Sequence, residues 1–95
     1  MIKRLVKMNF RLESIPDFIA IFELTAPQIR AFEGCHGVEL LQDIHRSNII
    51  STLSLWESED TLNHYRNSEM FHLTWKQTKS LFSEKAEATS YNIIS

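Results

Sequence analysis

The sequence predicts an α+β fold, in which a four-stranded antiparallel sheet carries two helices on one of its faces. Two observations indicate this fold. Segments whose apolar residues recur at every second position stand at both ends of the chain, and two segments rich in strand-forming residues stand in its middle. Two segments with helical spacing separate them. The chain has 95 residues, of which 43% are hydrophobic and 23% charged, so we expect one domain over residues 1–95.

The first strand and the first helix come from the N-terminal third of the chain. Residues 2–10 alternate between apolar and polar side chains, except at Arg4 and Leu5, and so predict a strand. The segment Ser-Ile-Pro-Asp at residues 14–17 supplies a capping serine, a first-turn proline and a first-turn acid. A helix is therefore predicted to begin there, and Gly34 ends it.

The middle of the chain predicts a hairpin. Residues 38–43 and 49–56 are rich in strand-forming side chains. A five-residue connection, Ile-His-Arg-Ser-Asn, joins them. Two strands that are joined this closely pair in the antiparallel direction.

A second helix and a last strand complete the chain. Residues 57–60 are rich in acids and predict the first turn of the helix. Ser68 is predicted to interrupt this helix and to act as the N-cap of a new helical stretch. Helical spacing then continues to Phe82. We expect the charged residues 84–87 to connect the helix to a final strand over residues 88–94.

The element order β-α-β-β-α-β is the ferredoxin-like arrangement, in which both helices cover the same face of the sheet. The other face should be mostly charged if it meets water. Apolar residues instead fall on both sides of the strands, as Leu5 and Val6 do in the first and Leu40 and Leu41 in the second. The simplest cover for the open face is a second copy of the chain, and a monomer with exposed apolar residues is the alternative.

The charge and the cysteine content exclude several kinds of partner. A net charge of −2 and a pI of about 6.0 leave no basic excess for a nucleic acid. The third predicted strand also lacks the basic and aromatic motif of RNA-binding domains with this element order. No apolar run is long enough for a signal peptide or a membrane helix, and the single Cys35 cannot form an internal disulfide. We therefore expect a cytoplasmic protein without a membrane partner.

Three segments at the junctions between predicted helices and strands contain distinctive residue patterns. Residues 26–40 (Ala-Pro-Gln-Ile-Arg-Ala-Phe-Glu-Gly-Cys-His-Gly-Val-Glu-Leu) lead from a helix end through a Gly-Cys-His-Gly turn into a strand. Residues 55–60 (Leu-Trp-Glu-Ser-Glu-Asp) lead from a strand into a helix, and residues 65–71 (Tyr-Arg-Asn-Ser-Glu-Met-Phe) break that helix. In this order and spacing, over nearly the whole chain, they resemble the antibiotic biosynthesis monooxygenase family.

The resemblance implies a dimeric α+β barrel, which is a homodimer built through the open faces of two sheets. It also implies that a small molecule binds in a groove between the sheet and the second helix. Members of the family include cofactor-independent quinol and anthrone oxygenases, haem-degrading oxygenases and domains without known activity. A fold does not fix a function, so the activity of this chain depends on the residues of its site.

Aromatic residues of the second helix would line the implied groove. They are Tyr65, Phe71 and Trp75, with His72 at the edge of the groove and His64 at its mouth. A flat aromatic substrate can stack on Trp75, and His72 can accept a phenolic proton because imidazole titrates near neutral pH. We therefore predict His72 and Trp75 as catalytic and the others as substrate-binding. The alternative is that the aromatics are core residues and the histidines are solvated.

Haem is not expected as a cofactor. Asn9 matches the first-strand asparagine of the haem-degrading members and is a further substrate-binding candidate. Tyr65 stands where those members have a tryptophan. Trp75 stands where they have the histidine ligand, and indole cannot bind iron, so haem would need His72, nearly one turn away, as a substitute ligand. No pair of histidines has metal-ligand spacing either. The sequence predicts a cofactor-independent monooxygenase for a quinol-like or polycyclic phenolic molecule, and a non-enzymatic small-molecule binding domain is the alternative.

Overall fold

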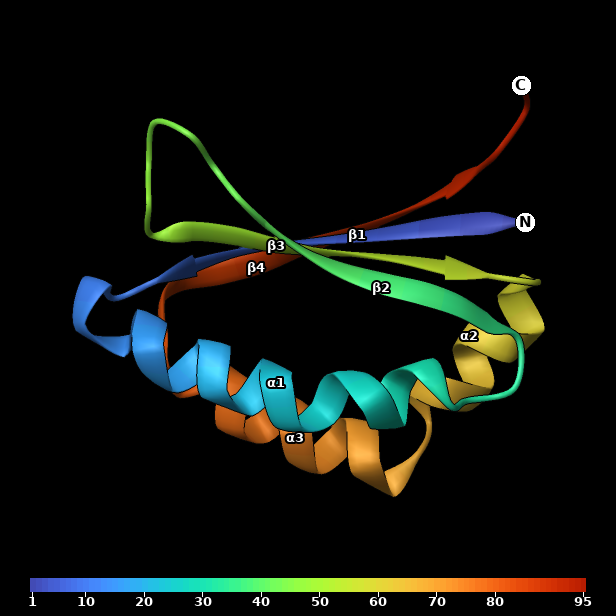
Figure 1. Ribbon diagram of the computed structural model, residues 1–95, viewed down its shortest axis with the longest axis horizontal. Helices are drawn as coiled ribbons and strands as arrows, with labels where there is room; N and C mark the ends of the chain where they lie inside the picture. Colours follow the sequence, from blue (N-terminus) through green and yellow to red (C-terminus); the bar gives the residue numbers. More distant parts are fainter.

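Four antiparallel strands form one sheet, and the helices lie against one face of it (Figure 1). The computed structural model describes residues 1–95. The strands are β1 (Ile2–Phe10), β2 (Cys35–Gln42), β3 (Ile49–Trp56) and β4 (Phe82–Asn92). They stand in the order β2-β3-β1-β4, and each neighbouring pair is antiparallel. The predicted α+β, ferredoxin-like fold is therefore confirmed.

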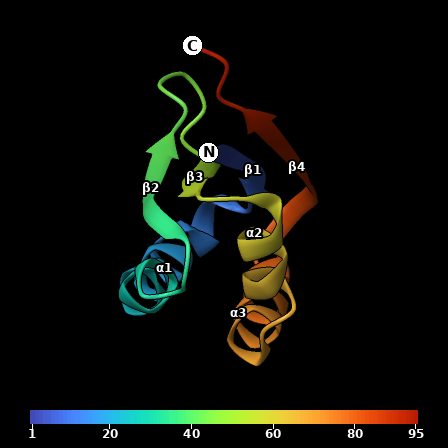
Figure 2. The same cartoon turned by 90° about the vertical axis from the view of Figure 1, so that its right-hand side faces the viewer.

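The helices form the second layer of the molecule. They are α1 (Ile15–Arg30), α2 (Glu59–Arg66) and α3 (Glu69–Lys79), and a short 3-10 turn (Leu12–Ser14) precedes α1. Figure 2 shows α1 beneath β2, and α2 with α3 on the side of β4. The predicted cap at Ser14 is wrong, because this residue has a helical backbone whereas a capping residue needs an extended one. Its hydroxyl accepts a hydrogen bond from Arg11 Nε at 3.4 Å instead.

Ser68 divides the second helical segment into α2 and α3, as the sequence predicts. Its hydroxyl accepts a hydrogen bond from the Phe71 N–H at 3.1 Å and donates one to the Tyr65 carbonyl at 2.6 Å. The side chain thus satisfies an orphan donor at the start of α3 and an orphan acceptor at the end of α2. This double cap sets the Tyr65 and Phe71 rings edge to face, with centroids 5.1 Å apart.

The last strand begins at Phe82 rather than at residue 88. Phe82 pairs with Phe10 of β1, and the pairing of β4 with β1 extends to Asn92. The charged residues 84–87, predicted as a connection, are therefore part of β4, and the preceding helix ends earlier than predicted. An edge strand tolerates such charges because one of its sides faces water, and the charges oppose pairing with another chain.

The buried core lies between the sheet and the helices. In β1 and β3 every second side chain points toward the helices, and the largest fully buried ones are Trp56, Phe10, Met8 and Ile50. Trp56 has an exposed fraction of 0%. Its indole N–H donates a hydrogen bond to the Ser54 hydroxyl at 2.9 Å, so the one polar atom of this side chain is satisfied inside the core.

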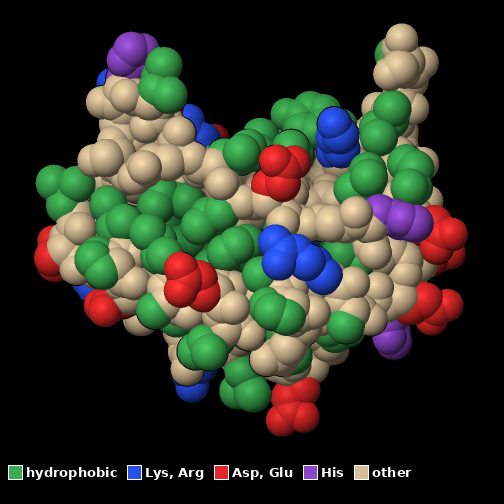
Figure 3. Space-filling view, viewed as in Figure 1, with side chains coloured by type: hydrophobic (Ala, Val, Ile, Leu, Met, Phe, Trp, Pro, Cys, Tyr) green, Lys and Arg blue, Asp and Glu red, His purple; other side chains and the backbone are tan.

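The opposite face of the sheet carries no helix. Val6 packs against the core, so the strand alternation turns its neighbour Leu5 to the open face, where Leu5 pairs with Leu53 of β3. Figures 1 and 3 show the β2–β3 loop and the C-terminal segment projecting on the same side of the molecule. Each projection carries an apolar side chain that meets solvent, since Ile44 is 90% and Ile94 is 94% exposed.

Candidate functional site

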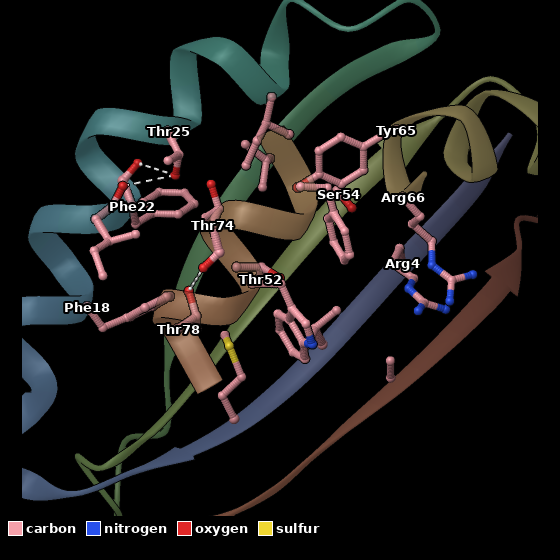
Figure 4. A pocket seen from close by; sticks show the side chains of 18 of the residues that line it. Arg4, Phe18, Phe22, Thr25, Thr52, Ser54, Tyr65, Arg66, Thr74 and Thr78 are labelled. Carbon is pink, nitrogen blue, oxygen red and sulfur yellow. Dashed lines mark hydrogen bonds between the residues drawn. The ribbon is translucent and has the colours of Figure 1, made fainter. Parts of the chain in front are cut away.

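A cavity of about 330 Å³ lies between the sheet and the three helices. Figure 4 shows its lining side chains converging from the sheet and from the helices that face it. The apolar part of the lining consists of Val6, Met8, Phe18, Ile21, Phe22, Ile29, Val38, Leu62, Phe71, Trp75 and Ala88. Small-molecule sites in proteins typically have volumes of about 300–1,000 Å³ and mostly apolar linings, so this cavity fits a small, largely apolar ligand.

Three side chains, Tyr65, Phe71 and Trp75, form what we name the aromatic wall of the cavity. Phe71 and Trp75 are four residues apart on α3, and their rings stack with centroids 6.0 Å apart and 10° between their planes. Tyr65 stacks on the buried Trp56 with centroids 5.0 Å apart. Because the core holds Trp56, the aromatic wall is supported from behind and offers rigid rings to a flat ligand.

Hydroxyl groups interrupt the apolar lining. Thr25 and Thr78 donate hydrogen bonds of 2.9 and 2.8 Å to carbonyls one turn earlier in their own helices. The Ser54 oxygen accepts the hydrogen bond from the buried indole. Thr52 also lines the cavity, and its hydroxyl has no hydrogen-bond partner within the chain. Thr52 is therefore free to bind a polar group of a ligand.

Tyr65 places a phenol group in the aromatic wall. Burial, together with the nearby Cys35 thiol, raises the pKa of Tyr65 to about 12. The phenol consequently stays protonated throughout the pH range in which enzymes usually work. Tyr65 can donate a hydrogen bond to a ligand oxygen but cannot remove a proton from it.

Two arginines lie at one end of the cavity. Figure 4 shows Arg4 from β1 and Arg66 from α2 with their guanidinium groups pointing toward one another. Burial, and repulsion by Arg66, lower the pKa of Arg4. Arg4 Nη1 donates to Ser90 Oγ at 3.0 Å and Arg66 Nη1 to Asn63 Oδ1 at 3.5 Å, and both acceptors are neutral. No carboxylate lies within salt-bridge distance of either guanidinium.

The structure brings three of the predicted site residues together, since Tyr65, Phe71 and Trp75 all line the cavity. His72 does not line it. Its side chain is exposed, although its ring centroid lies 5.9 Å from that of Phe71. The predicted catalytic pair is thus separated, with Trp75 at the cavity and His72 on the solvent side of α3.

The other two predicted binding residues also lie outside the lining. His64 is exposed on α2, and its ring packs edge-on against the ring of Phe32, with the ring centroids 6.3 Å apart. Asn9 stands between the buried Met8 and Phe10 in β1, so the strand alternation turns its side chain toward the open face of the sheet. Neither residue contacts a ligand that is confined to the cavity.

The two cavity arginines were not predicted as site residues. The sequence does carry one signal for Arg4, because this charged residue interrupts the alternation of the first strand. Its position faces the helices, where an apolar residue is expected, and so marks a polar group inside the fold. Arg66 leaves no such signal, since a basic residue in the last turn of a helix is common on any surface helix.

No group of three or more His, Cys, Asp or Glu side chains is placed to hold a metal ion. No helix combines the length and the apolar character that a membrane span requires.

The fold and the cavity define a ferredoxin-like α+β protein with a cavity between sheet and helices. The family model described as antibiotic biosynthesis monooxygenase matches residues 1–77, and the chain belongs to that family. None of the curated proteins matches the sequence.

Solved structures with the same fold match nearly the whole chain. A conserved protein from Methanosarcina mazei Go1 has 19% identity and a TM-score of 0.92, over 96% of this chain and 90% of its own. A structure described as antibiotic biosynthesis monooxygenase has 13% identity and a TM-score of 0.91, over 100% of both chains. A mutant of SnoaB, a cofactor-independent oxygenase from Streptomyces nogalater, has 14% identity and a TM-score of 0.88, over 99% of this chain and 93% of its own.

Proposed function

We propose that this protein is a cofactor-independent monooxygenase that oxidises a quinol-like or polycyclic phenolic molecule in the cavity. The observation that carries the proposal is the aromatic wall beside an apolar cavity of about 330 Å³, in a chain of a monooxygenase family. The similarity in fold to SnoaB, which is described as a cofactor-independent oxygenase, supports it.

Such a reaction needs no cofactor when the substrate itself supplies the electrons. An ionised phenol gives one electron to dioxygen, and the two radicals then combine to a peroxide. For an anthrone, the two C–H bonds of the ring CH₂ break and a C=O bond forms, while the second oxygen atom leaves as water. The contribution of the protein is to orient the ring by stacking and to keep bulk water from the radical pair.

The aromatic wall takes the main binding role in this proposal. Trp75 and Phe71 stack on the substrate, and Tyr65 donates a hydrogen bond to one of its oxygens. His72 remains a predicted proton acceptor, and because it is exposed it can act only on a proton that reaches the edge of α3. The binding roles predicted for Asn9 and His64 also stay predictions.

We also propose that the protein acts as a homodimer in the cytoplasm. The dimer is supported by the apolar residues on the open face of the sheet, among them Leu5 and Leu53, which a second sheet would cover. The two exposed projections next to this face, the β2–β3 loop and the C-terminal segment, can reach around a partner copy. The free thiol of Cys35 agrees with a reducing compartment.

A second candidate function is small-molecule binding without turnover. The observation that favours it is the composition of the lining, which includes no His, Cys, Asp, Glu or Lys side chain. No side chain in contact with the cavity is therefore an ordinary general base near neutral pH. A ligand that binds tightly and is recovered unchanged would support this function over the oxygenase.

Oxygen consumption by the purified, chelator-treated protein tests the proposal. The panel contains naphthoquinols, anthrones and flavonols, and the compared variants are Trp75→Ala, His72→Ala and His45→Ala. We expect substrate-dependent uptake that Trp75→Ala lacks, whereas His45→Ala, on the β2–β3 loop, behaves as the native protein. Equal rates in all three variants would show that the site lies elsewhere, and no uptake with any compound would favour the binding function.

A further inference from the structure

Two positive charges stand at one end of the cavity without a counter-ion. Arg4 is partly buried and Arg66 is exposed, and their known acceptors are the neutral Ser90 and Asn63 side chains. Like charges that are held close together repel each other, and the repulsion is stronger where one of them is shielded from water. An anion that lies between the two guanidiniums would offset this repulsion.

The rest of the cavity lining neither competes for these charges nor supplies a base. Lining residues from α1, α3, β2 and β3 are apolar or carry hydroxyl groups, and β4 contributes only Ala88. No carboxylate faces the cavity from any of these elements. The cavity thus offers an apolar body with a single charged end, and that end is cationic.

We propose that Arg4 and Arg66 bind the ionised oxygen of the phenolic ligand between them and so make the phenol more acidic in the cavity. The proposal rests on the cavity being the site of the proposed oxygenase, and it explains how the ligand could ionise although the lining contains no general base. The O–H bond of the ligand breaks, its electron pair stays on oxygen, and the proton passes to water at the exposed end. The guanidinium N–H groups donate hydrogen bonds to the resulting oxyanion.

The expected effect follows from the charges. An opposite charge within a few ångströms lowers the pKa of an acid by about 1–3 units. Solvent screens the exposed Arg66 more than Arg4, which places the effect near the lower end of that range. We therefore expect the ligand pKa to fall by about one unit, which is about a tenfold increase in the ratio of ionised to neutral ligand below that pKa.

The test uses nitronaphthol, whose ionised form absorbs visible light, bound to the full-length protein under argon. Its absorbance is titrated against pH free in solution, with the native protein, and with the variants Arg4→Gln and Arg66→Gln. Arg46→Gln, on the β2–β3 loop away from the cavity, is the matched control. Thermal melting confirms that each variant folds, and because Arg66 is exposed on α2, its variant stays informative even if Arg4→Gln does not fold.

Native protein and Arg46→Gln are expected to lower the pKa of the bound ligand by about one unit, and each cavity variant to reduce this shift. An unchanged ligand pKa, a shift that survives both cavity variants, or no binding at all would each overturn the anion site. Anthrone-dependent oxygen uptake is measured separately. Uptake without a ligand pKa shift would remove the arginine role alone, whereas a shift without uptake would remove the oxygenase and leave the anion site.

Discussion

The hydrogen bond from Trp56 to Ser54 supports the aromatic wall, and its removal is a sharp test of the site. Ser54→Ala deletes the acceptor of an indole N–H whose side chain is 0% exposed, and no other acceptor for that group is found. A buried donor without a partner costs about 1–3 kcal/mol, so we take about 2 kcal/mol for this variant. In a domain of this size each kcal/mol lowers Tm by about 4–8 °C, which predicts a loss of about 8–16 °C.

The matched control for this variant is Ser51→Ala. Ser51 lies on the same strand but on the open face, and its hydroxyl makes no hydrogen bond, so this change removes a hydroxyl without leaving an orphan donor. Thermal unfolding of both variants by circular dichroism measures the difference. If the two variants melt within about 2 °C of each other, the argument that this hydrogen bond supports the wall is refuted.

Three further predictions concern the turn before β2, the buried phenol and the open face. An added methyl at Gly34 would lie 2.5 Å from the Thr61 side chain, whereas at Gly37 it meets nothing, and both glycines have positive φ. Urea unfolding should therefore show Gly34→Ala to be less stable than Gly37→Ala by about 1 kcal/mol or more, and equal losses would exclude the steric cause. Since the pKa of Tyr65 rises from 10.0 to about 12 on folding, the folded state holds the proton more tightly. The contribution of Tyr65 to the free energy of unfolding is fully present below pH 10.0 and is lost as the pH rises toward about 12. In Tyr65→Phe, the free energy of unfolding measured by denaturation should therefore decline less steeply over this pH range. Leu53→Asp puts a charge in the proposed dimer face and should yield monomers in light scattering, while an unchanged dimer would place the interface elsewhere.

Much of the fold is predictable from the sequence because alternation and helical spacing reflect which faces are buried. The hairpin and the cap at Ser68 follow from local residue types, and both are confirmed, although β2 begins at Cys35 rather than at residue 38. The start of β4 does not, because residues 84–87 are charged and carry no apolar alternation. Only their pairing with β1, a contact between the two ends of the chain, makes them a strand.

The candidate site is predictable only in part. Phe71 and Trp75 are four residues apart, and that spacing alone puts them on one face of a helix. His72 follows Phe71 directly, and a helix turns by about 100° per residue, so its side chain points away from the cavity. Arg4 lies on β1 and Arg66 at the end of α2. No local sequence pattern predicts that two residues so far apart in the chain line the same cavity.

The central claim is that the protein oxidises an aromatic substrate in the cavity with dioxygen and without a cofactor. The most direct measurement supplies an anthrone and isotope-labelled dioxygen to the chelator-treated protein and determines the mass of the product. We predict a quinone that carries one labelled oxygen atom, formed by the native protein and by Leu73→Ala, on the exposed side of α3, but not by Trp75→Ala. Product formation at the uncatalysed rate, or equal formation by Trp75→Ala, would contradict the claim.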